Sequence, residues 1–295
     1  MNNEAVKTTN FKKIRNIIIA FLVYSIVLLF LGRNLSFIPQ INFTSQEKNT
    51  DDLRKNVLAK FLKGEKGSYS IYYKDLKTGE EFGIDENKVL TGASLNKLPI
   101  VAYMYSQAAS GKINLEDQIV VQEDDIQDYG TGSLRYQDPG QAYSLKTLAK
   151  LSLEQSDNTA AHVLGIKLDL NNVQKYMKSL GLISTNMDNN KTSAKDMGKL
   201  LELIYNENVT SKALTHEMLD FMEDTDIEDR LLRNLPKNVI VYHKTGDAVG
   251  MIHDVGIIDG GNPFVLAVLT SDIADEEHTK QTIGKIAKFI YDGQK

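Results

Sequence analysis

The sequence predicts an α/β protein of the α+β type, with an antiparallel five-stranded sheet flanked by helices and an all-helical lobe beside it. Three observations predict this fold. Two strand-like segments with turn residues between them come early in the chain. A long region follows with apolar residues at three- and four-residue steps. Three more strand-like runs then precede a last helical segment, so the simplest closure joins the early strands to the late ones.

The early elements are a helix and a strand pair. The helix is predicted over residues 51–62, where apolar residues recur at helical spacing, a capping residue precedes them and a glycine follows. Strands are predicted over 69–76 and 81–84. The tripeptide Lys-Thr-Gly at 77–79 lies between them, and its glycine suits a turn. We therefore interpret this Lys-Thr-Gly as structural.

The later elements follow from a change of period. Helical periodicity dominates from Leu95 to about Pro236. Strands are then predicted over 239–245, 251–258 and 264–271, and a closing helix over 283–291. The predicted domain over 51–295 thus has an α/β lobe of residues 51–93 and 237–295 and a helical lobe of residues 94–236. Ligand sites often lie where lobes meet, so we expect the chemistry at this junction.

The N-terminus predicts a membrane segment. Residues 17–32, IIIAFLVYSIVLLFLG, are uncharged, and basic residues precede them, which places the N-terminus in the cytoplasm. The run is shorter than the ~20 residues of a usual spanning helix. It reaches past the ~7–15 residues of a cleavable signal. We expect residues 1–33 to be a short tail and an uncleaved single-pass anchor in the cell membrane, in preference to a removed signal peptide. Residues 34–50 are then a polar tether to an extracytoplasmic domain.

Composition excludes several functions. The chain has no cysteine, which rules out disulfides, thiolate metal sites and a cysteine nucleophile. Beyond residue 33 acidic residues outnumber basic ones, which argues against a nucleic-acid partner. The five histidines have no paired metal-ligand spacing, so no metal site is expected. Nothing in the sequence indicates an oligomeric state.

The first candidate motif is Ser94-x-x-Lys97 at the start of a predicted helix. A serine needs a base to become a nucleophile, and an amine one helical turn away can be that base. The helix start also offers free N–H groups to a developing oxyanion. A second copy, at Ser45 and Lys48, lies in the polar tether with no apolar run after it. Alone, the motif is weak, because a serine often only caps a helix.

Two further motifs are also ambiguous on their own. Ser156-Asp157-Asn158 lies between two helical segments, where all three residue types are ordinary helix caps. Lys244-Thr245-Gly246 ends an apolar strand, and the glycine removes side-chain bulk beside a cleft. The alternative for this motif is a simple turn at a strand end.

Taken together and in this order, the three motifs form the set associated with serine β-lactamases and penicillin-binding proteins. The chain resembles the class A β-lactamase group of these serine hydrolases over about residues 51–295. The stretches DYGTGSLRY and KTGDAVGMIHDVGII add local resemblance. The resemblance implies acyl transfer from β-lactams or from peptidoglycan-derived wall peptides of the acyl-D-alanyl-D-alanine type, without a metal or cofactor.

The resemblance also implies roles for the motif residues. Ser94 would be the acylated nucleophile and Lys97 the base beside it. Ser156 would relay a proton to the leaving nitrogen, helped by the positive charge of Lys244.

The remaining roles concern binding. Asn158 would hold the amide of the substrate, and Lys244 with Thr245 would bind its carboxylate. Gly246 is also expected among the substrate-binding residues. The N–H groups of Ser94 and Asp247 would form the oxyanion hole. Asp247 is an unusual residue for an oxyanion-hole position. Its carboxylate must point away from the site, because otherwise it repels an anionic substrate.

One feature of the family is missing. The resemblance calls for a loop glutamate that activates the deacylating water, but here a short connection, LGLISTNMDNNKTSAKDMGKLL, joins two helices. The place of the glutamate falls near Lys191 or in a deletion, and Asp188 is the nearest acid. We assign Asp188 no role and expect slow deacylation. The sequence therefore favours a membrane-anchored serine hydrolase, with a non-turnover penicillin-binding sensor or an inactive binding protein as the alternative.

Overall fold

A computed structural model describes Tyr24 and residues 43–294 of the protein. The chain divides into two compact units, residues 1–47 and 48–295, and the description below concerns the second. Apart from Tyr24, the predicted anchor over residues 17–32 lies outside the described residues. Among the helices that are described, none combines the length and the apolar character needed to cross a membrane.

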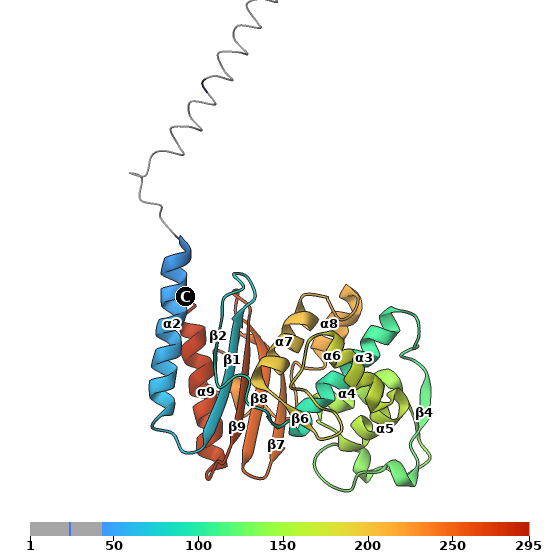
Figure 1. Ribbon diagram of the computed structural model, residues 1–295. Helices are drawn as coiled ribbons and strands as arrows, with labels where there is room; N and C mark the ends of the chain where they lie inside the picture. The colour runs from blue at the N-terminus through green and yellow to red at the C-terminus, as the bar shows by residue number, and fades with distance from the viewer. Residues whose placement is uncertain (1–23, 25–42, 295) are drawn as a thin grey trace, which may run out of the picture. The chain divides into compact units, whose positions relative to one another are not determined.

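A five-stranded antiparallel sheet in the order β2-β1-β9-β8-β7 forms the centre of this unit (Figure 1). The first strands of the chain pair with the last one, as predicted, and Tyr72 lies opposite Ala267. The fold class expected from the sequence is therefore confirmed. The strands are β1 (Ser68–Asp75), β2 (Glu81–Ile84), β7 (Ile240–Ala248), β8 (Met251–Asp259) and β9 (Phe264–Ser271).

The central strand β9 contributes to two hydrophobic cores because its side chains alternate between the two faces of the sheet. Phe264, Leu266 and Val268 pack in the core that also contains residues of α9 (Glu276–Asp292). Val265, Ala267 and Leu269 pack in the core shared with the helical lobe. Burial on both faces explains why the β9 sequence is apolar throughout and not alternating.

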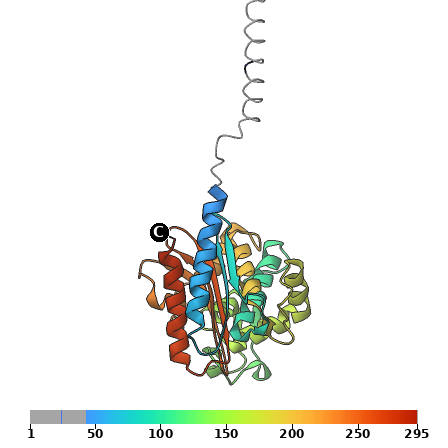
Figure 2. The ribbon, with the colours of Figure 1, turned by 60° about the vertical axis from the view of Figure 1, so that its left-hand side comes forward.

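Two helices cover the outer face of the sheet (Figures 1 and 2). They are α9 and the part of α2 (Phe43–Leu62) that belongs to this unit, which contributes the buried Leu58. Both helices begin earlier than predicted: α2 includes residues 43–50 of the expected tether, and α9 begins at Glu276. The N-terminus of α9 is fixed by Asp275, whose carboxylate accepts from the N–H of His278. Apolar periodicity marks only the buried face of a helix and therefore misses such polar first turns.

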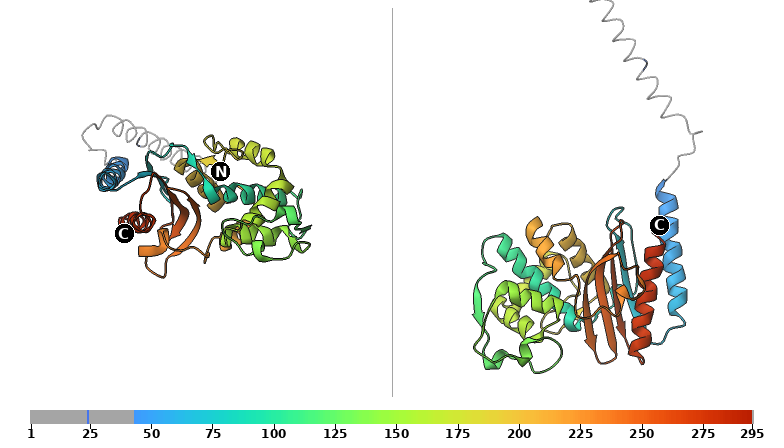
Figure 3. Two further views of the ribbon diagram at one scale, coloured as in Figure 1. Left: turned by 90° about the horizontal axis from the view of Figure 1, so that it is seen from below. Right: turned by 180° about the vertical axis from the view of Figure 1, so that it is seen from behind.

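The helical lobe lies on the inner face of the sheet (Figure 3). Helix α7 packs directly against the sheet, where a Cβ on Gly198 would lie 2.2 Å from Cδ1 of Tyr72. The lobe also contains a two-stranded sheet, β4 (Gln118–Val120) with β5 (Ala142–Ser144), which the sequence did not predict. Its helices are α3 (Lys97–Ala109), α4 (Leu145–Glu154), α5 (Asn158–Leu168), α6 (Leu170–Ser179), α7 (Ala194–Tyr205) and α8 (Lys212–Asp220).

The early Lys-Thr-Gly is a turn, as predicted. The carboxylate of Asp75 accepts from the backbone N–H groups of Lys77 and Thr78, both at 2.8 Å. Gly79 has φ = +78°, a conformation that favours glycine. These backbone bonds serve the connection between β1 and β2, whereas Nζ of Lys77 donates to Oδ1 of Asn262 at 2.6 Å in the connection between β8 and β9.

Candidate active site

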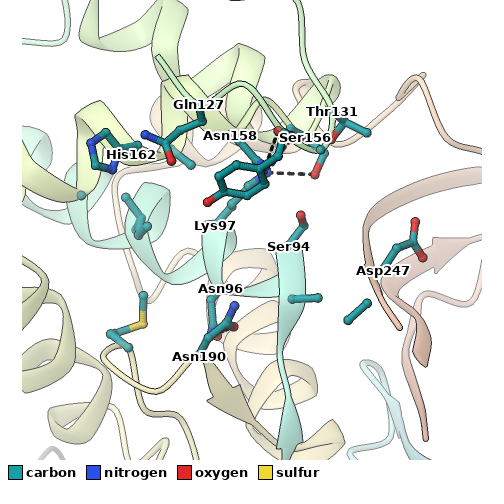
Figure 4. A pocket seen from close by; sticks show the side chains of 18 of the residues that line it. Ser94, Asn96, Lys97, Gln127, Thr131, Ser156, Asn158, His162, Asn190 and Asp247 are labelled. Carbon is teal, nitrogen blue, oxygen red and sulfur yellow. Dashed lines mark hydrogen bonds between the residues drawn. The ribbon is translucent and has the colours of Figure 1, made fainter. Parts of the chain in front are cut away.

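A cavity of about 890 Å³ lies at the junction of the two lobes. It brings together side chains from three distant parts of the sequence (Figure 4). Six of the eight residues expected from the sequence line it: Ser94, Lys97, Ser156, Asn158, Thr245 and Asp247. Lys244 is buried behind the wall and contacts Ser156.

Ser94 lies in a short 3₁₀ turn, η1 (Ala93–Asn96), which leads directly into α3. The preceding Ala93 has φ = +49°, a left-handed conformation that is unfavourable for alanine. Such strain persists where the surrounding structure fixes it, often at functional sites. The turn presents the side chain of Ser94 to the cavity, and Lys97 is the first residue of α3 (Figure 4).

Lys97 has the surroundings of a base. Its side chain is buried, and Nζ contacts three oxygens: Oδ1 of Asn158 at 2.7 Å, Oγ of Ser156 at 3.2 Å and the carbonyl oxygen of Ser156. Burial, and next the charge of Lys244, lower the pKa of Lys97 to about 6. A neutral amine has two hydrogens for the amide and carbonyl oxygens, and its lone pair remains available to a hydroxyl proton.

The hydroxyl of Ser156 connects Lys97 with Lys244. Nζ of Lys244 lies 2.9 Å from Oγ of Ser156 and 3.0 Å from the carbonyl oxygen of Thr245. Burial lowers the pKa of Lys244 to about 7, and the charge of Asp254 opposes this shift. A proton taken by Lys97 therefore has a hydrogen-bonded route through Ser156.

Asp157 holds Ser156 in place. Its carboxylate accepts from the N–H of Ala160 at 2.9 Å, as the cap of α5, and from the N–H of Leu134 at 2.8 Å. Ser156 itself has φ = +54°, so the caps fix a strained backbone. The helix-cap interpretation of this motif is confirmed for Asp157, whereas Ser156 lies between two buried amines and its catalytic role stays a prediction.

The free edge of β7 leaves backbone N–H groups that do not pair with β8. β7 is the last strand of the sheet, and the N–H of His243 points away from β8, to the carbonyl oxygen of Met222 at 2.8 Å. N–H groups two residues apart point to the same side of a strand, so that of Asp247 also points away from β8. This orientation agrees with the donor role expected for Asp247 beside Ser94.

Gly246 allows the close approach of β7 to the turn of Ser94. A Cβ at this position would lie 3.0 Å from the carbonyl oxygen of Gly92 and 3.1 Å from Cγ of Leu95. We expect Gly246→Ala to cost about 1–3 kcal/mol of unfolding free energy, because overpacking forces backbone shifts. Acylation of Ser94 should slow with it. Denaturant unfolding and penicillin labelling measure the two effects.

The control for this prediction is Gly64→Ala, whose added Cβ makes only an ordinary contact, 3.6 Å from the carbonyl oxygen of Phe61. Equal stability and equal acylation in the two variants would contradict the close-approach argument.

The carboxylate of Asp247 is held by Arg230, a residue that the sequence analysis missed. Nη1 of Arg230 lies 2.8 Å from Oδ1, and Nη2 lies 2.8 Å from Oδ2. Arg230 comes from the segment before the 3₁₀ turn η4 (Leu231–Asn234), and no motif marked it. The expectation that the carboxylate turns away is met only in part, because Asp247 still lines the cavity.

The connection between α6 and α7 supplies no glutamate to the cavity. Among the described residues, those that line it include two acids, Asp169 and Asp247, and Asp188 is exposed elsewhere. Lys191 donates to Oγ1 of Thr91 at 2.9 Å. An amide pair that the sequence did not predict lies near Ser94 instead: Nδ2 of Asn96 donates to Oδ1 of Asn190 at 2.6 Å (Figure 4).

His253 and His243 make hydrogen bonds that stabilise the fold. Nδ1 of His253 accepts from the N–H of Thr270 at 3.0 Å, so Nε2 carries the proton to the carbonyl oxygen of Thr91. His243 of β7 pairs with Asp254 of the neighbouring strand β8, at 2.9 Å. Within the described part of the chain, no group of three or more histidine, aspartate and glutamate side chains is arranged for a metal ion.

Comparisons with known proteins place the chain in a family. The model of the "Beta-lactamase enzyme family" matches residues 53–294. Beta-lactamase VEB-1 from Pseudomonas aeruginosa is 25% identical over 229 residues, which cover 67% of this chain and 76% of that protein. A part of the beta-lactamase regulatory protein BlaB from Streptomyces cacaoi is 36% identical over 96 residues, 32% of this chain and 30% of that one.

Solved structures agree on the fold. PBP-A superposes with a TM-score of 0.76 at 23% identity, over 82% of this chain and 96% of that one. A mutant of PBP-A in an acyl-enzyme complex with penicillin G superposes equally well, at 0.76 and 23% identity, over 84% and 96% of the two chains. The chain therefore belongs to the beta-lactamase enzyme family, whose members are serine hydrolases that act on amide bonds.

Proposed function

We propose that this chain is a membrane-anchored, extracytoplasmic serine hydrolase that forms an acyl-enzyme on Ser94 with β-lactams or D-alanyl-D-alanine-type wall peptides. The observation that carries the proposal is the pair of buried amines on either side of the Ser156 hydroxyl. Lys97 has a pKa lowered to about 6 and lines the same cavity as Ser94. A buried amine with a depressed pKa beside a serine is the arrangement that nucleophilic catalysis requires.

The acylation step follows from this arrangement. Oγ of Ser94 attacks the carbonyl carbon while its proton passes to Nζ of Lys97, and the N–H groups of Ser94 and Asp247 hold the oxyanion. The C–N bond then breaks, and the proton reaches the leaving nitrogen through Ser156, whose hydroxyl Lys244 contacts. The ester on Ser94 remains, and the amine leaves or, in a β-lactam, stays tethered.

Deacylation is slow in this proposal. It needs a base for the attacking water, and the amides of Asn96 and Asn190 near Ser94 donate and accept hydrogen bonds but take no proton at neutral pH. The absence of a glutamate from the described cavity lining supports the same conclusion. It also supports the second candidate, a penicillin-binding sensor that stays acylated.

Time-resolved labelling tests the proposal. We expect a fluorescent penicillin to label the detergent-solubilised full chain at Ser94 and the label to persist for minutes or longer. Ser94→Ala should abolish labelling, and Ser45→Ala, in the other Ser-x-x-Lys, should leave it intact. A folded protein that takes no label would refute acylation. Label lost within seconds would refute slow deacylation.

The proposal of a membrane anchor depends on residues 17–32 alone. They form an uncharged apolar run that basic residues precede. The full-length chain should sediment with membranes and resist carbonate extraction. A shortened chain released from the membrane would favour a cleaved signal peptide instead.

A further inference from the structure

A buried cation lies directly behind an exposed carboxylate at the rim of the cavity. The side chain of Arg230 is 1% exposed and that of Asp247 is 46% exposed. Besides the two bonds to Asp247, the guanidinium donates to Oδ1 of Asp229 at 3.0 Å and to the carbonyl oxygen of His253 at 2.8 Å. Asp247 lines the cavity, whereas Arg230 does not. Asp247 thus separates the guanidinium from any molecule bound in the cavity.

The position of this ion pair along β7 relates it to the substrate. Side chains two residues apart lie on one face of a strand, about 7 Å apart, so Asp247 follows Thr245 on the same face. In the proposed function, Thr245 and Lys244 receive the carboxylate of the substrate. A substrate carboxylate there meets Asp247 as a like charge and finds the nearest guanidinium already bound in a two-bond pair.

We propose that Asp247 is a specificity-determining residue that disfavours substrates with a carboxylate at the β7 rim, by repelling it and by occupying Arg230. Carboxylate substrates of the proposed function still react, but more slowly than acyl donors whose leaving group is neutral at that place, such as an ester or an amide. This inference rests on the proposed function, because it concerns acylation at Ser94. Specificity depends on the difference between the affinities for two substrates. A group in the site that repels one of them therefore increases specificity for the other.

The test compares two probes that differ in this charge and in one methyl group, benzylpenicillin and its methyl ester. The second-order rate of acylation of the full chain is measured for both, and the acid-to-ester ratio is the readout. We expect Asp247→Asn to raise this ratio at least about tenfold, the equivalent of about 1.4 kcal/mol. A ratio within twofold of the wild-type value would overturn the proposal.

A matched double variant separates competition for Arg230 from simple loss of a negative charge. In Arg230→Gln/Asp247→Asn the pair is neutral and no guanidinium is released, so most of the rise in the ratio should disappear. A full rise in the double variant would overturn the competition. Asp247→Glu, which keeps the charge, should keep the low ratio, and a tenfold rise there would also contradict the proposal.

Folding is checked by thermal melting of every variant. If Asp247→Asn melts below the assay temperature, Asp247→Ala replaces it, because removing a half-exposed side chain lets water reach Arg230. The same tenfold rise is expected. Wild-type protein that neither probe acylates would refute the proposed function, whereas acylation with an unchanged ratio in the variants would refute this inference alone.

Discussion

Lys97→Ala is expected to slow acylation of Ser94 by about 10²- to 10⁴-fold, the usual contribution of a positioned general base. Lys97 is a buried amine that lines the same cavity as Ser94, so the substitution removes the base proposed for the serine proton. The rate is measured with a fluorescent penicillin at pH 7. Lys97→Arg is the matched variant, because it keeps hydrogen-bond donors but stays protonated at every working pH, whereas Lys97, with a pKa of about 6, is mostly neutral at pH 7.

If Lys97→Arg acylates at the wild-type rate, a permanently protonated group is sufficient at this position and the base assignment is wrong. If both variants lose the rate and still melt as the wild type does, proton transfer is the lost contribution. The buried guanidinium also has to fit among the oxygens of Ser156 and Asn158, so the melting curve is needed to separate misfolding from lost catalysis.

The pH dependence of the wild type gives an independent readout. The pKa of Lys97 is lowered to about 6, so its neutral, basic form increases as pH rises through 6. The pKa of Lys244 is lowered to about 7, so its positive charge is lost as pH rises through 7. Acylation should therefore rise and then fall, with its maximum between these values. A rate that increases steadily to pH 9 would contradict the role given to Lys244.

Much of this site was predictable because each motif sits at a recognisable break in periodicity. Ser94 comes where helical spacing begins, Ser156 between two helical segments, and Lys244 at the end of an apolar strand. Period placed the three segments and distinguished the two Lys-Thr-Gly tripeptides, and the resemblance to the serine β-lactamase motif set predicted that the three segments share one site.

The parts that were missed depend on tertiary contacts. Arg230 carries no local signal, and only the folded chain shows that its guanidinium binds Asp247. Asn96 and Asn190 meet across 94 positions of sequence, which no spacing rule relates. The early start of α9 was missed for a different reason, since its first turn is polar and Asp275, not apolar spacing, defines it.

The second large effect is expected at Asp254, which is fully buried and touches no substrate. Its Oδ1 lies 2.9 Å from Nδ1 of His243, and its Oδ2 accepts from the N–H of Leu231 at 3.1 Å. Its charge also opposes the effect of burial on Lys244. Asp254→Ala should lower the free energy of unfolding by about 3–5 kcal/mol, because the buried ammonium group of Lys244 loses the carboxylate of Asp254 as a counter-charge. The exposed Glu228→Ala should change it by no more than about 0.5 kcal/mol.

Asp254→Asn separates the electrostatic role from the structural one. The amide nearly keeps the shape of the side chain and one acceptor but removes the negative charge, so the pKa of Lys244 should fall below its wild-type value of about 7. The falling limb of the acylation profile then moves to lower pH, and the rate at pH 7 drops because less Lys244 is charged. An unshifted limb in a variant with a lowered melting temperature would mean that Asp254 only supports the fold. A shifted limb would identify it as the residue that keeps Lys244 protonated beside Ser156.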